Sequence, residues 1–402
     1  MEAALKDSDT QRFVYMDYAA TTPVDSRVLE TMLPYLSERF GNPNSMYALG
    51  RQAYRAMEEA REKVAHLIGA ASANEVIFTG SGTESDNALL LGIAARAKPD
   101  RKHVIVSAFE HHAVLEPAHT LEKRGFEVTY LRPRIDGVIA LDDLQAALRD
   151  DTALVSVMHG NNEIGTVQPI RELAAAAHER GAYMHTDAAQ TLGKVPFDVA
   201  DMGIDAASFS GHKIYAPKGI GVMYLKRGTP FEPLLKGGGQ EYKKRSGTQN
   251  VAGAVGFATA LQLMIEDLPA EAKRLSALRD RLAQGVLNGI ENTEMTSSAL
   301  ERLPNIVSLL IKGVEGEAML LQLDGKGIAV STGSACSSGS LEPSHVLLSI
   351  GCPPEVAHGS LRVSLGRYSS EEDVEYFLQT LPPIVERLRA MSPVYAKMFG
   401  SA

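Results

Sequence analysis

A lysine in a tight turn is the residue whose type and setting most strongly suggest chemistry. Lys213 follows a short apolar run, residues 205–209, and a Ser-Gly-His turn at 210–212. A lysine held at the mouth of a crevice can have its pKa lowered by desolvation and by neighbouring positive charge. It can then act as a nucleophilic amine toward an aldehyde. The alternative is an ordinary surface lysine, and the neighbouring motifs are needed to distinguish these two interpretations.

A segment rich in glycine and hydroxyl side chains, TGSGTES, begins directly after a predicted strand. Gly80 and Gly82 allow the backbone to approach another group closely, and Thr83 would begin a helix. The free N–H groups at a helix start favour an anion such as a phosphate. A plain capped turn is the alternative for this segment.

A carboxylate ends another predicted strand. Asp187 lies in HTDAAQ, with Gln190 three residues on. A buried carboxylate needs a cationic or hydrogen-bonding partner, which a protonated ring nitrogen would supply. A helix cap is the alternative. Taken together, a phosphate-binding helix start, an acid for a ring nitrogen and a Schiff-base lysine describe a pyridoxal phosphate site.

Other polar residues are individually less specific. His111, in FEHHAVL, could stack on an aromatic cofactor, be a satisfied core histidine, or lie at a helix start. Adjacent histidines make a poor metal pair, so no metal site is expected. Residues 161–163, in HGNNEIG, could line the same crevice or form a polar loop. Arg362 lies in a strand-like run, and a buried guanidinium there is expected to pair with a carboxylate of the protein or of a substrate. Arg367 is expected to be solvated.

The two cysteines cannot make a disulfide framework. Cys336 lies among small residues at 333–339, a composition that predicts a flexible, exposed loop. A cysteine there is either reactive or incidental. Cys352, beside two prolines, is expected to be incidental.

The pattern along the chain indicates how these residues are positioned. Short runs rich in β-branched residues alternate with helical stretches, which predicts an α/β fold with a mostly parallel, seven-stranded sheet covered by helices. The expected strands are 75–79, 103–107, 127–131, 153–158, 182–187, 206–210 and 221–225. The expected helices include 83–97, 112–124, 141–149 and 169–180. Ligands of such sheets bind beyond the carboxyl ends of the strands, where the polar clusters fall.

The pattern changes after residue 248. A long amphipathic segment spans 251–289, with an expected break at Pro269, and strand-like runs follow at 305–311, 328–332 and 361–365. We expect a large cofactor-binding domain over 14–260. The remainder, 261–402 with residues 1–13, is expected to be a smaller α+β domain that carries the cysteine loop at about 331–342.

Composition limits the class of protein. The 402 residues carry a net charge of −9, which argues against nucleic acid or an anionic membrane as the main partner. No uncharged apolar run is long enough for a membrane span. The polar N-terminus lacks the apolar core of a signal peptide. These features favour the cytoplasm.

The motifs, taken in order, resemble those of class I cysteine desulfurases, the NifS/IscS family. The resemblance covers roughly residues 14–390. The motifs are MDYAATTP, GNPNSMYALG, TGSGTESDN, EHHAVL, HGNNEIG, HTDAAQTLGK, SFSGHKIYAPKGIG, RSGTQN, STGSACSSGSLEPSHVL and LRVSLGR.

The resemblance implies a homodimer with the fold type I architecture of pyridoxal phosphate enzymes, and a role for each matching residue. Lys213 matches the lysine bound to the cofactor, His111 the histidine stacked on its ring, and Cys336 the cysteine that takes up sulfur. The other matches are Asp187 with the pyridinium nitrogen, Gln190 with the phenolic oxygen, Gly82, Thr83, Ser210 and His212 with the phosphate, Thr248 with the phosphate of the other subunit, and Asn162 and Arg362 with the substrate carboxylate.

The implied activity is conversion of L-cysteine to L-alanine through a pyridoxal phosphate aldimine. The sulfur would pass as a persulfide on Cys336 to an acceptor such as an iron–sulfur scaffold protein. A selenocysteine lyase or an aminotransferase-like enzyme is the alternative on the same site. A sulfur relay without chemistry is a third possibility, but the presence of Lys213, Asp187 and Cys336 argues against it.

Overall fold

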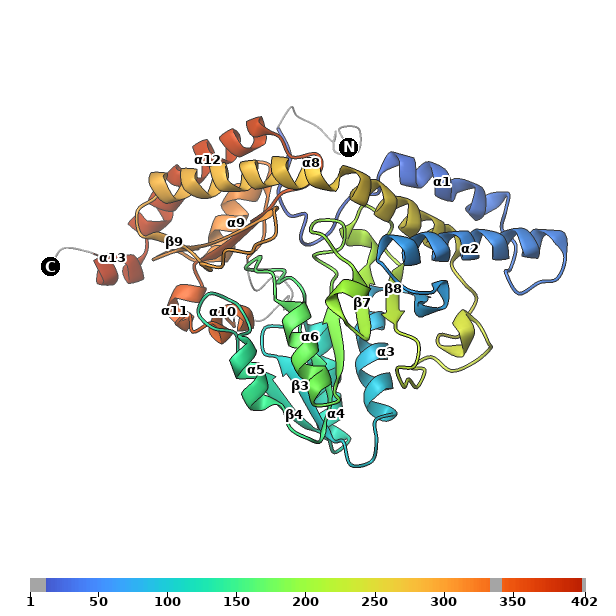
Figure 1. Cartoon of the computed structure of the whole chain (residues 1–402). Coiled ribbons are helices and arrows are strands. Elements are labelled where there is room, and N and C mark those ends of the chain that lie inside the picture. Colours follow the sequence, from blue (N-terminus) through green and yellow to red (C-terminus); the bar gives the residue numbers. More distant parts are fainter. Residues whose placement is uncertain (1–11, 333–341, 400–402) are drawn as a thin grey trace.

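A seven-stranded sheet forms the centre of the larger part of the molecule (Figure 1). The computed structural model describes residues 12–332 and 342–399. The strand order is β2-β8-β7-β6-β5-β3-β4. The strands are β2 (Val76–Thr79), β3 (His103–Ser107), β4 (Glu127–Leu131), β5 (Thr152–Ser156), β6 (Tyr183–Asp187), β7 (Ala206–Ser210) and β8 (Gly221–Leu225).

The prediction of a mostly parallel sheet is confirmed. Strands β7, β6, β5, β3 and β4 pair in parallel, and β8 pairs antiparallel with both β2 and β7. All seven expected strands are present within a residue or two. The inner strands are buried along their whole length because helices cover both faces, which explains their near-continuous apolar sequences.

Helices on the two faces complete the layers. Helices α3 and α4 pack on one face of the sheet, while α2, α6 and the first half of α8 pack on the other. The helices up to residue 289 are α1 (Ser26–Ser37), α2 (Ala48–Leu67), α3 (Gly82–Ala95), α4 (His112–Lys123), α5 (Leu141–Ala147), α6 (Ile170–Glu179), α7 (Val199–Met202) and α8 (Val251–Gly289), with 3-10 turns η1 (Ala73–Glu75), η2 (Gly211–Lys213) and η3 (Glu241–Lys243).

The long helix α8 corrects one expectation. The break predicted at Pro269 is wrong, because α8 continues through this proline for 39 residues. A proline removes one backbone hydrogen bond. Packing of both halves of the helix outweighs that loss: residues 251–264 join the core of the sheet and residues 275–286 join a second core. One stretch of α8 is apolar and long enough to cross a membrane, but 56% of it is buried inside the fold, as in the core helix of a soluble protein.

The second core lies between the far half of α8 and helix α12, at the other end of the molecule in Figure 1. An antiparallel sheet of order β12-β10-β9 and a parallel pair, β1 with β11, build it. Its elements are β1 (Val14–Tyr15), β9 (Thr293–Met295), β10 (Ile306–Ile311), α9 (Gly316–Asp324), β11 (Ile328–Ala329), α10 (His345–Ser349), α11 (Pro354–Ala357), β12 (Ser360–Ser364), α12 (Glu371–Ala390) and α13 (Pro393–Phe399).

Two cores thus share one helix. The expected domain boundary at residue 260 falls inside α8, and β1, placed by sequence in the large domain, packs with the second core. The division of the chain into a cofactor-binding domain and a smaller α+β domain stays a prediction.

Candidate active site

A cavity of about 470 Å³ lies where the carboxyl ends of β6 and β7 meet the starts of α3 and α4 and strand β12. Ten of the residues singled out from the sequence line it together. They are Gly82, Thr83, His111, Asn162, Asp187, Gln190, Ser210, His212, Lys213 and Arg362. These residues come from six separate segments of the chain, and the parallel sheet brings them to one edge, as such sheets do for their ligands.

One end of the cavity is suited to an anion. Ser81 caps α3 by accepting a hydrogen bond from the backbone N–H of Glu84, so Gly82 and Thr83 begin the helix. The first N–H groups of a helix lack intrahelical partners. A Cβ at position 82 would lie 3.1 Å from the Cβ of Ser210, so glycine lets the helix start approach the end of β7 closely.

Lys213 is held by the turn that follows β7. The 3-10 turn Gly211–Lys213 is tight, because the N–H of Gly211 bonds to the carbonyl of Ile220 and a Cβ there would lie 2.6 Å from the Ile220 side chain. The Lys213 Nζ donates to the carbonyl oxygens of Ala19 and Ala20 at 2.6 and 2.7 Å. These contacts aim the amine into the cavity and explain why a lysine occupies a buried strand end.

Two carboxyl groups lie at the base of the cavity. Asp187 ends β6, accepts a hydrogen bond from the N–H of Ala189 at 2.9 Å, and has its pKa raised to about 6, chiefly by burial. Asp86 on α3 also lines the cavity, and its buried Oδ1 has no hydrogen-bond partner among the described residues. Burial and the nearby Asp187 raise the pKa of Asp86 well above its ordinary value.

The lining fits pyridoxal phosphate. A cationic ring nitrogen would relieve the buried charge of Asp187, because a buried carboxylate without a cationic partner is costly. The start of α3 would receive the phosphate, and the Lys213 amine would meet the aldehyde.

His111 fits two of the interpretations considered from the sequence, a residue at a helix start and a ring in the cofactor site. It caps α4, with Nδ1 accepting the N–H of Ala113 at 3.0 Å, and its ring also lines the cavity. The proton of the neutral ring is therefore on Nε2. Burial, assisted by the positive charges of Lys213 and His112, lowers the pKa of His111 to about 4, so the ring is neutral at pH 7.

Arg362 on β12 is buried at the opposite side of the cavity. Its guanidinium donates to Asp17 Oδ1 and to the carbonyl of Asn162, both at 2.9 Å. The Nε of Arg362 is buried with no hydrogen-bond partner among the described residues. A protein carboxylate thus already pairs with this arginine, and the two bonds use only some of its five N–H donors.

Some residues named from the sequence lie elsewhere. Thr248 is exposed and lines a separate cavity of about 130 Å³ with Gly80 and Arg245. Asn161 holds its loop: its amide nitrogen donates to the carbonyl of Phe109, its amide oxygen accepts from the N–H groups of Glu163 and Ile164, and it does not line the site.

The expectation for Arg367 is wrong. Its guanidinium pairs with Asp25 and with Asp267 and lies over the Tyr215 ring, and its side chain is 15% exposed. Asp25 and Asp267 could not be recognised as its partners from the sequence, since they lie 342 and 100 positions away.

The cysteines differ in what the structure describes. Cys336 lies outside the described residues. On its N-terminal side Ser331 lines the cavity, and on its C-terminal side Ser344 donates to the buried carboxyl group of Glu163. Cys352 is half-buried, packs at the edge of the large core and has its thiol pKa raised by burial.

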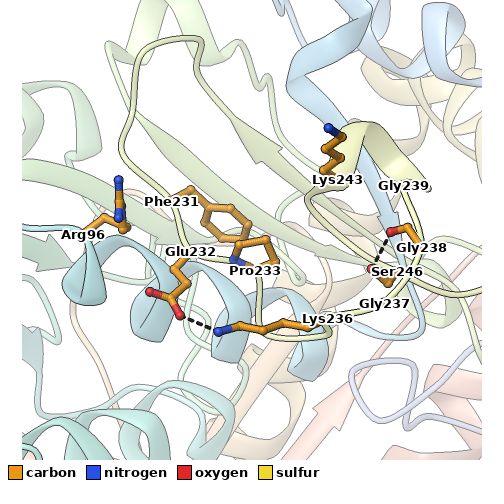
Figure 2. A pocket seen from close by; sticks show the side chains of 10 residues that line it. All are labelled: Arg96, Phe231, Glu232, Pro233, Lys236, Gly237, Gly238, Gly239, Lys243 and Ser246. Atoms are coloured by element: carbon orange, nitrogen blue, oxygen red, sulfur yellow. Dashed lines mark hydrogen bonds and ion pairs between the residues drawn. The ribbon is translucent and has the colours of Figure 1, made fainter.

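A second cavity of about 470 Å³ lies apart from this site (Figure 2). Its wall runs from Arg96 at the end of α3 along the segment 231–246, and the side chains of Lys236 and Lys243 lie around it. None of the residues predicted for the active site lines it.

Three residues of the site escaped the sequence reasoning. Asp17 belongs to MDYAATTP, but that motif suggested no role for its carboxylate. Asp86 shares a helix face with Gly82, four residues earlier, which was the available signal. Lys194, the last residue of HTDAAQTLGK, is buried and donates to Gln190, and no role was assigned to it from the sequence.

Comparison with known proteins places the chain in a class. A family model described as "Aminotransferase class-V" matches residues 14–377. The protein therefore belongs to this class of pyridoxal phosphate-dependent enzymes, in agreement with its fold and cavity.

Similar proteins narrow that class. The chain is 51% identical over 383 residues to the cysteine desulfurase IscS of Dictyoglomus turgidum, covering 95% of this chain and 97% of the relative. It is 49% identical over 380 residues to cysteine desulfurase 2 of Trichormus variabilis, covering 94% and 95%. A solved NifS-like protein has a TM-score of 0.88 at 40% identity, covering 94% of this chain and 100% of that structure. The protein is a cysteine desulfurase.

Proposed function

We propose that this desulfurase converts L-cysteine to L-alanine in the cavity around Lys213, with the residue roles implied by the motifs. The observation that carries the proposal is that ten residues from six segments of the chain line one cavity, with an anion site, a buried carboxylate and an amine. A solved structure titled "SspA in complex with cysteine", which has a TM-score of 0.79 and is 36% identical, supports cysteine as the substrate.

The chemistry of each lining residue suits it to a different role toward the cofactor. Bound pyridoxal phosphate supplies an aldehyde for the substrate amine and a ring that accepts electrons from the bond being broken. Asp187 holds the proton on the ring nitrogen, and neutral His111 offers a flat face for the ring. Lys213 Nζ, once released, moves the α-proton. Gln190 donates an N–H toward the phenolic oxygen.

The substrate carboxylate binds at Arg362. Arg362 and Asn162 both line the cavity, and the Nε of Arg362 has no hydrogen-bond partner among the described residues. Asp17 holds the guanidinium in position by pairing with Nη2. A hydrogen bond between charged groups in a buried site contributes about 1.5 to 3 kcal/mol, enough to orient a small amino acid.

Cys336 receives the sulfur. It lies five residues after Ser331, so its Cα is within about 18 Å of that cavity residue even along an extended chain. Its thiolate attacks the substrate sulfur, an S–S bond forms, the C–S bond breaks, and its electron pair stays with the carbon. That carbon then takes a proton to become the methyl group of alanine.

The test measures alanine and sulfide made from L-cysteine with a thiol reductant present. Cys336→Ala should make neither, whereas Cys352→Ala, the matched control, should match the parent enzyme. Equal alanine from the parent and from Cys336→Ala would reject the role of Cys336. No alanine from the parent would reject the proposed function.

We also propose that the enzyme is a homodimer in which Thr248 serves the other subunit. Thr248 is exposed and does not line the active-site cavity of its own subunit. Large apolar side chains are exposed along α1, the segment between α1 and α2, and the first turns of α2. They are Leu29, Leu33, Leu36, Phe40, Met46, Tyr47 and Tyr54. Exposed apolar side chains in such number on neighbouring segments favour a protein interface.

The oligomeric state is measured by sedimentation velocity. We expect a dimer that Leu33→Glu dissociates and that Leu300→Glu, a change at an isolated exposed leucine, leaves intact. A monomeric parent protein would contradict the proposal.

The persulfide is proposed to pass to an acceptor protein in the cytoplasm, such as an iron–sulfur scaffold, without direct contact with nucleic acid or membrane. With ³⁵S-labelled cysteine, label should move from the enzyme to the scaffold's cysteines. Label that stays on the enzyme when scaffold is added would contradict this.

A further inference from the structure

Lys194 is a buried lysine behind the active-site cavity. It is 7% exposed, and among the described residues its hydrogen bonds go to Gln190 and not to a carboxylate. Its Nζ donates to the backbone carbonyl of Gln190 at 3.1 Å and to the side-chain oxygen of Gln190 at 3.4 Å. A buried ammonium group without a carboxylate is costly, so its presence calls for a function.

The contacts of Lys194 fix the orientation of the Gln190 amide. A lysine ammonium has donors and no acceptor, so the amide atom that faces it must be the oxygen. On the other side, the amide nitrogen of Gln190 donates to the carbonyl of Ala19 at 2.9 Å. That carbonyl also accepts from Lys213 Nζ. The amide is therefore held from both ends, with its nitrogen toward Ala19, which also lines the cavity.

The same contacts link two amines through one chain of hydrogen bonds. Lys194 donates to Gln190, Gln190 donates to the carbonyl of Ala19, and Lys213 donates to the same carbonyl. We propose that Lys194 is a positioning residue of the active site: it fixes Gln190 as a donor toward the cofactor, and it places a second cationic group behind Lys213. The first part rests on the proposed role of Gln190.

The charge of Lys194 depends on pH in the working range. Burial, assisted by the positive charge of Lys213, lowers the pKa of Lys194 to about 7. A small cavity beside Lys194 is also lined by four other titratable side chains, Tyr18, Tyr215, Glu271 and Arg367. Below pH 7 a charged Lys194 disfavours a proton on Lys213, and well above pH 7 a neutral Lys194 has no such effect.

Two variants separate the hydrogen bond from the charge. Lys194→Gln removes the charge but keeps a donor for Gln190, whereas Lys194→Met removes both. Lys226→Met, at a lysine 47% exposed beyond β8, is the matched control. The apoprotein is acetylated briefly and modification of Lys213 is measured by peptide mass spectrometry. Cofactor affinity is measured by fluorescence titration with pyridoxal phosphate.

At pH 6 we expect Lys213 to be acetylated about three- to tenfold more slowly in both Lys194 variants than in the parent, with no difference at pH 9. Cofactor Kd should rise about three- to tenfold in Lys194→Met and stay near the parent value in Lys194→Gln. The melting temperature of the Lys194→Met apoprotein at pH 6 should equal or exceed that of the parent, because the buried charge is gone.

Parent-like acetylation at pH 6 together with unchanged cofactor affinity would overturn the inference. A large fall in the melting temperature of both variants would also overturn it, by assigning Lys194 a structural role. Both measurements use apoprotein and cofactor without cysteine. They therefore decide the role of Lys194 even if the parent enzyme were to release no alanine.

Discussion

Replacing Asp187 by asparagine should make the apoprotein more stable while it damages cofactor binding. Burial raises the pKa of Asp187 from its ordinary value of 3.8 to about 6. The folded state therefore binds this proton more readily than the unfolded state does. The contribution of the group to stability is fully present below about pH 4 and is lost as the pH rises through 6.

The size of the effect follows from the two pKa values. Each pKa unit corresponds to about 1.36 kcal/mol, so the difference between 3.8 and about 6 corresponds to about 3 kcal/mol of unfolding free energy. Asparagine keeps the oxygen that accepts the N–H of Ala189 and carries no charge. At pH 8 the variant apoprotein should exceed the parent in stability by up to about 3 kcal/mol, and near pH 4 the two should converge.

The assay is urea unfolding of the two apoproteins, followed by circular dichroism between pH 4 and 8. Asp150→Asn, at a carboxylate 96% exposed, is the control and should follow the parent throughout. Pyridoxal phosphate should bind the Asp187→Asn protein much more weakly, because the ring nitrogen loses its anionic partner. A variant less stable than the parent by the same amount at both pH values would refute the reasoning.

Three other changes test separate parts of the molecule. Glu241→Gln should cost about 3 to 5 kcal/mol of stability in urea unfolding, because it breaks a buried, bidentate ion pair with Arg61 at 2.6 and 2.8 Å; a loss under about 1 kcal/mol would contradict this. Gly82→Ala should weaken pyridoxal phosphate binding in a fluorescence titration, since its Cβ would crowd Ser210 at 3.1 Å; an unchanged Kd would argue against the anion site. Arg362→Lys should raise KM for L-cysteine about 10- to 100-fold in steady-state kinetics, because one donor group replaces a planar fork; loss of kcat with KM unchanged would point to another role.

The sequence predicted the sheet well because its strands are apolar on both faces and separated by turn residues. Helices α1 and α2 were not anticipated. The buried face of α2 consists largely of alanines such as Ala53, Ala56 and Ala60, which give a weak hydrophobic period. The break expected at Pro269 was wrong because the prediction considered only the local effect of proline on a helix. It left out the packing that holds both halves of α8 in place.

The candidate site was predictable for residues whose type and position relative to a predicted strand indicate a chemical role. Lys213, Asp187 and the start of α3 could be named because each follows a recognisable strand. Asp17 could not be paired with Arg362, since 345 positions separate them. The burial of Lys194 likewise depends on tertiary contacts that no local pattern encodes.

The pairing of β1 with β11 has a consequence for synthesis on the ribosome. Val14 emerges early, but its strand partner Ile328 is added 314 residues later. Asp17 likewise cannot form its ion pair until Arg362 has been added. At about 5 to 20 residues per second, this delay lasts roughly 15 to 70 seconds. The carbonyl oxygens that hold Lys213 follow β1 directly, so the nascent chain has no finished cofactor pocket until nearly all of it has been translated. Interrupted translation would therefore yield fragments that lack the walls needed to retain the cofactor.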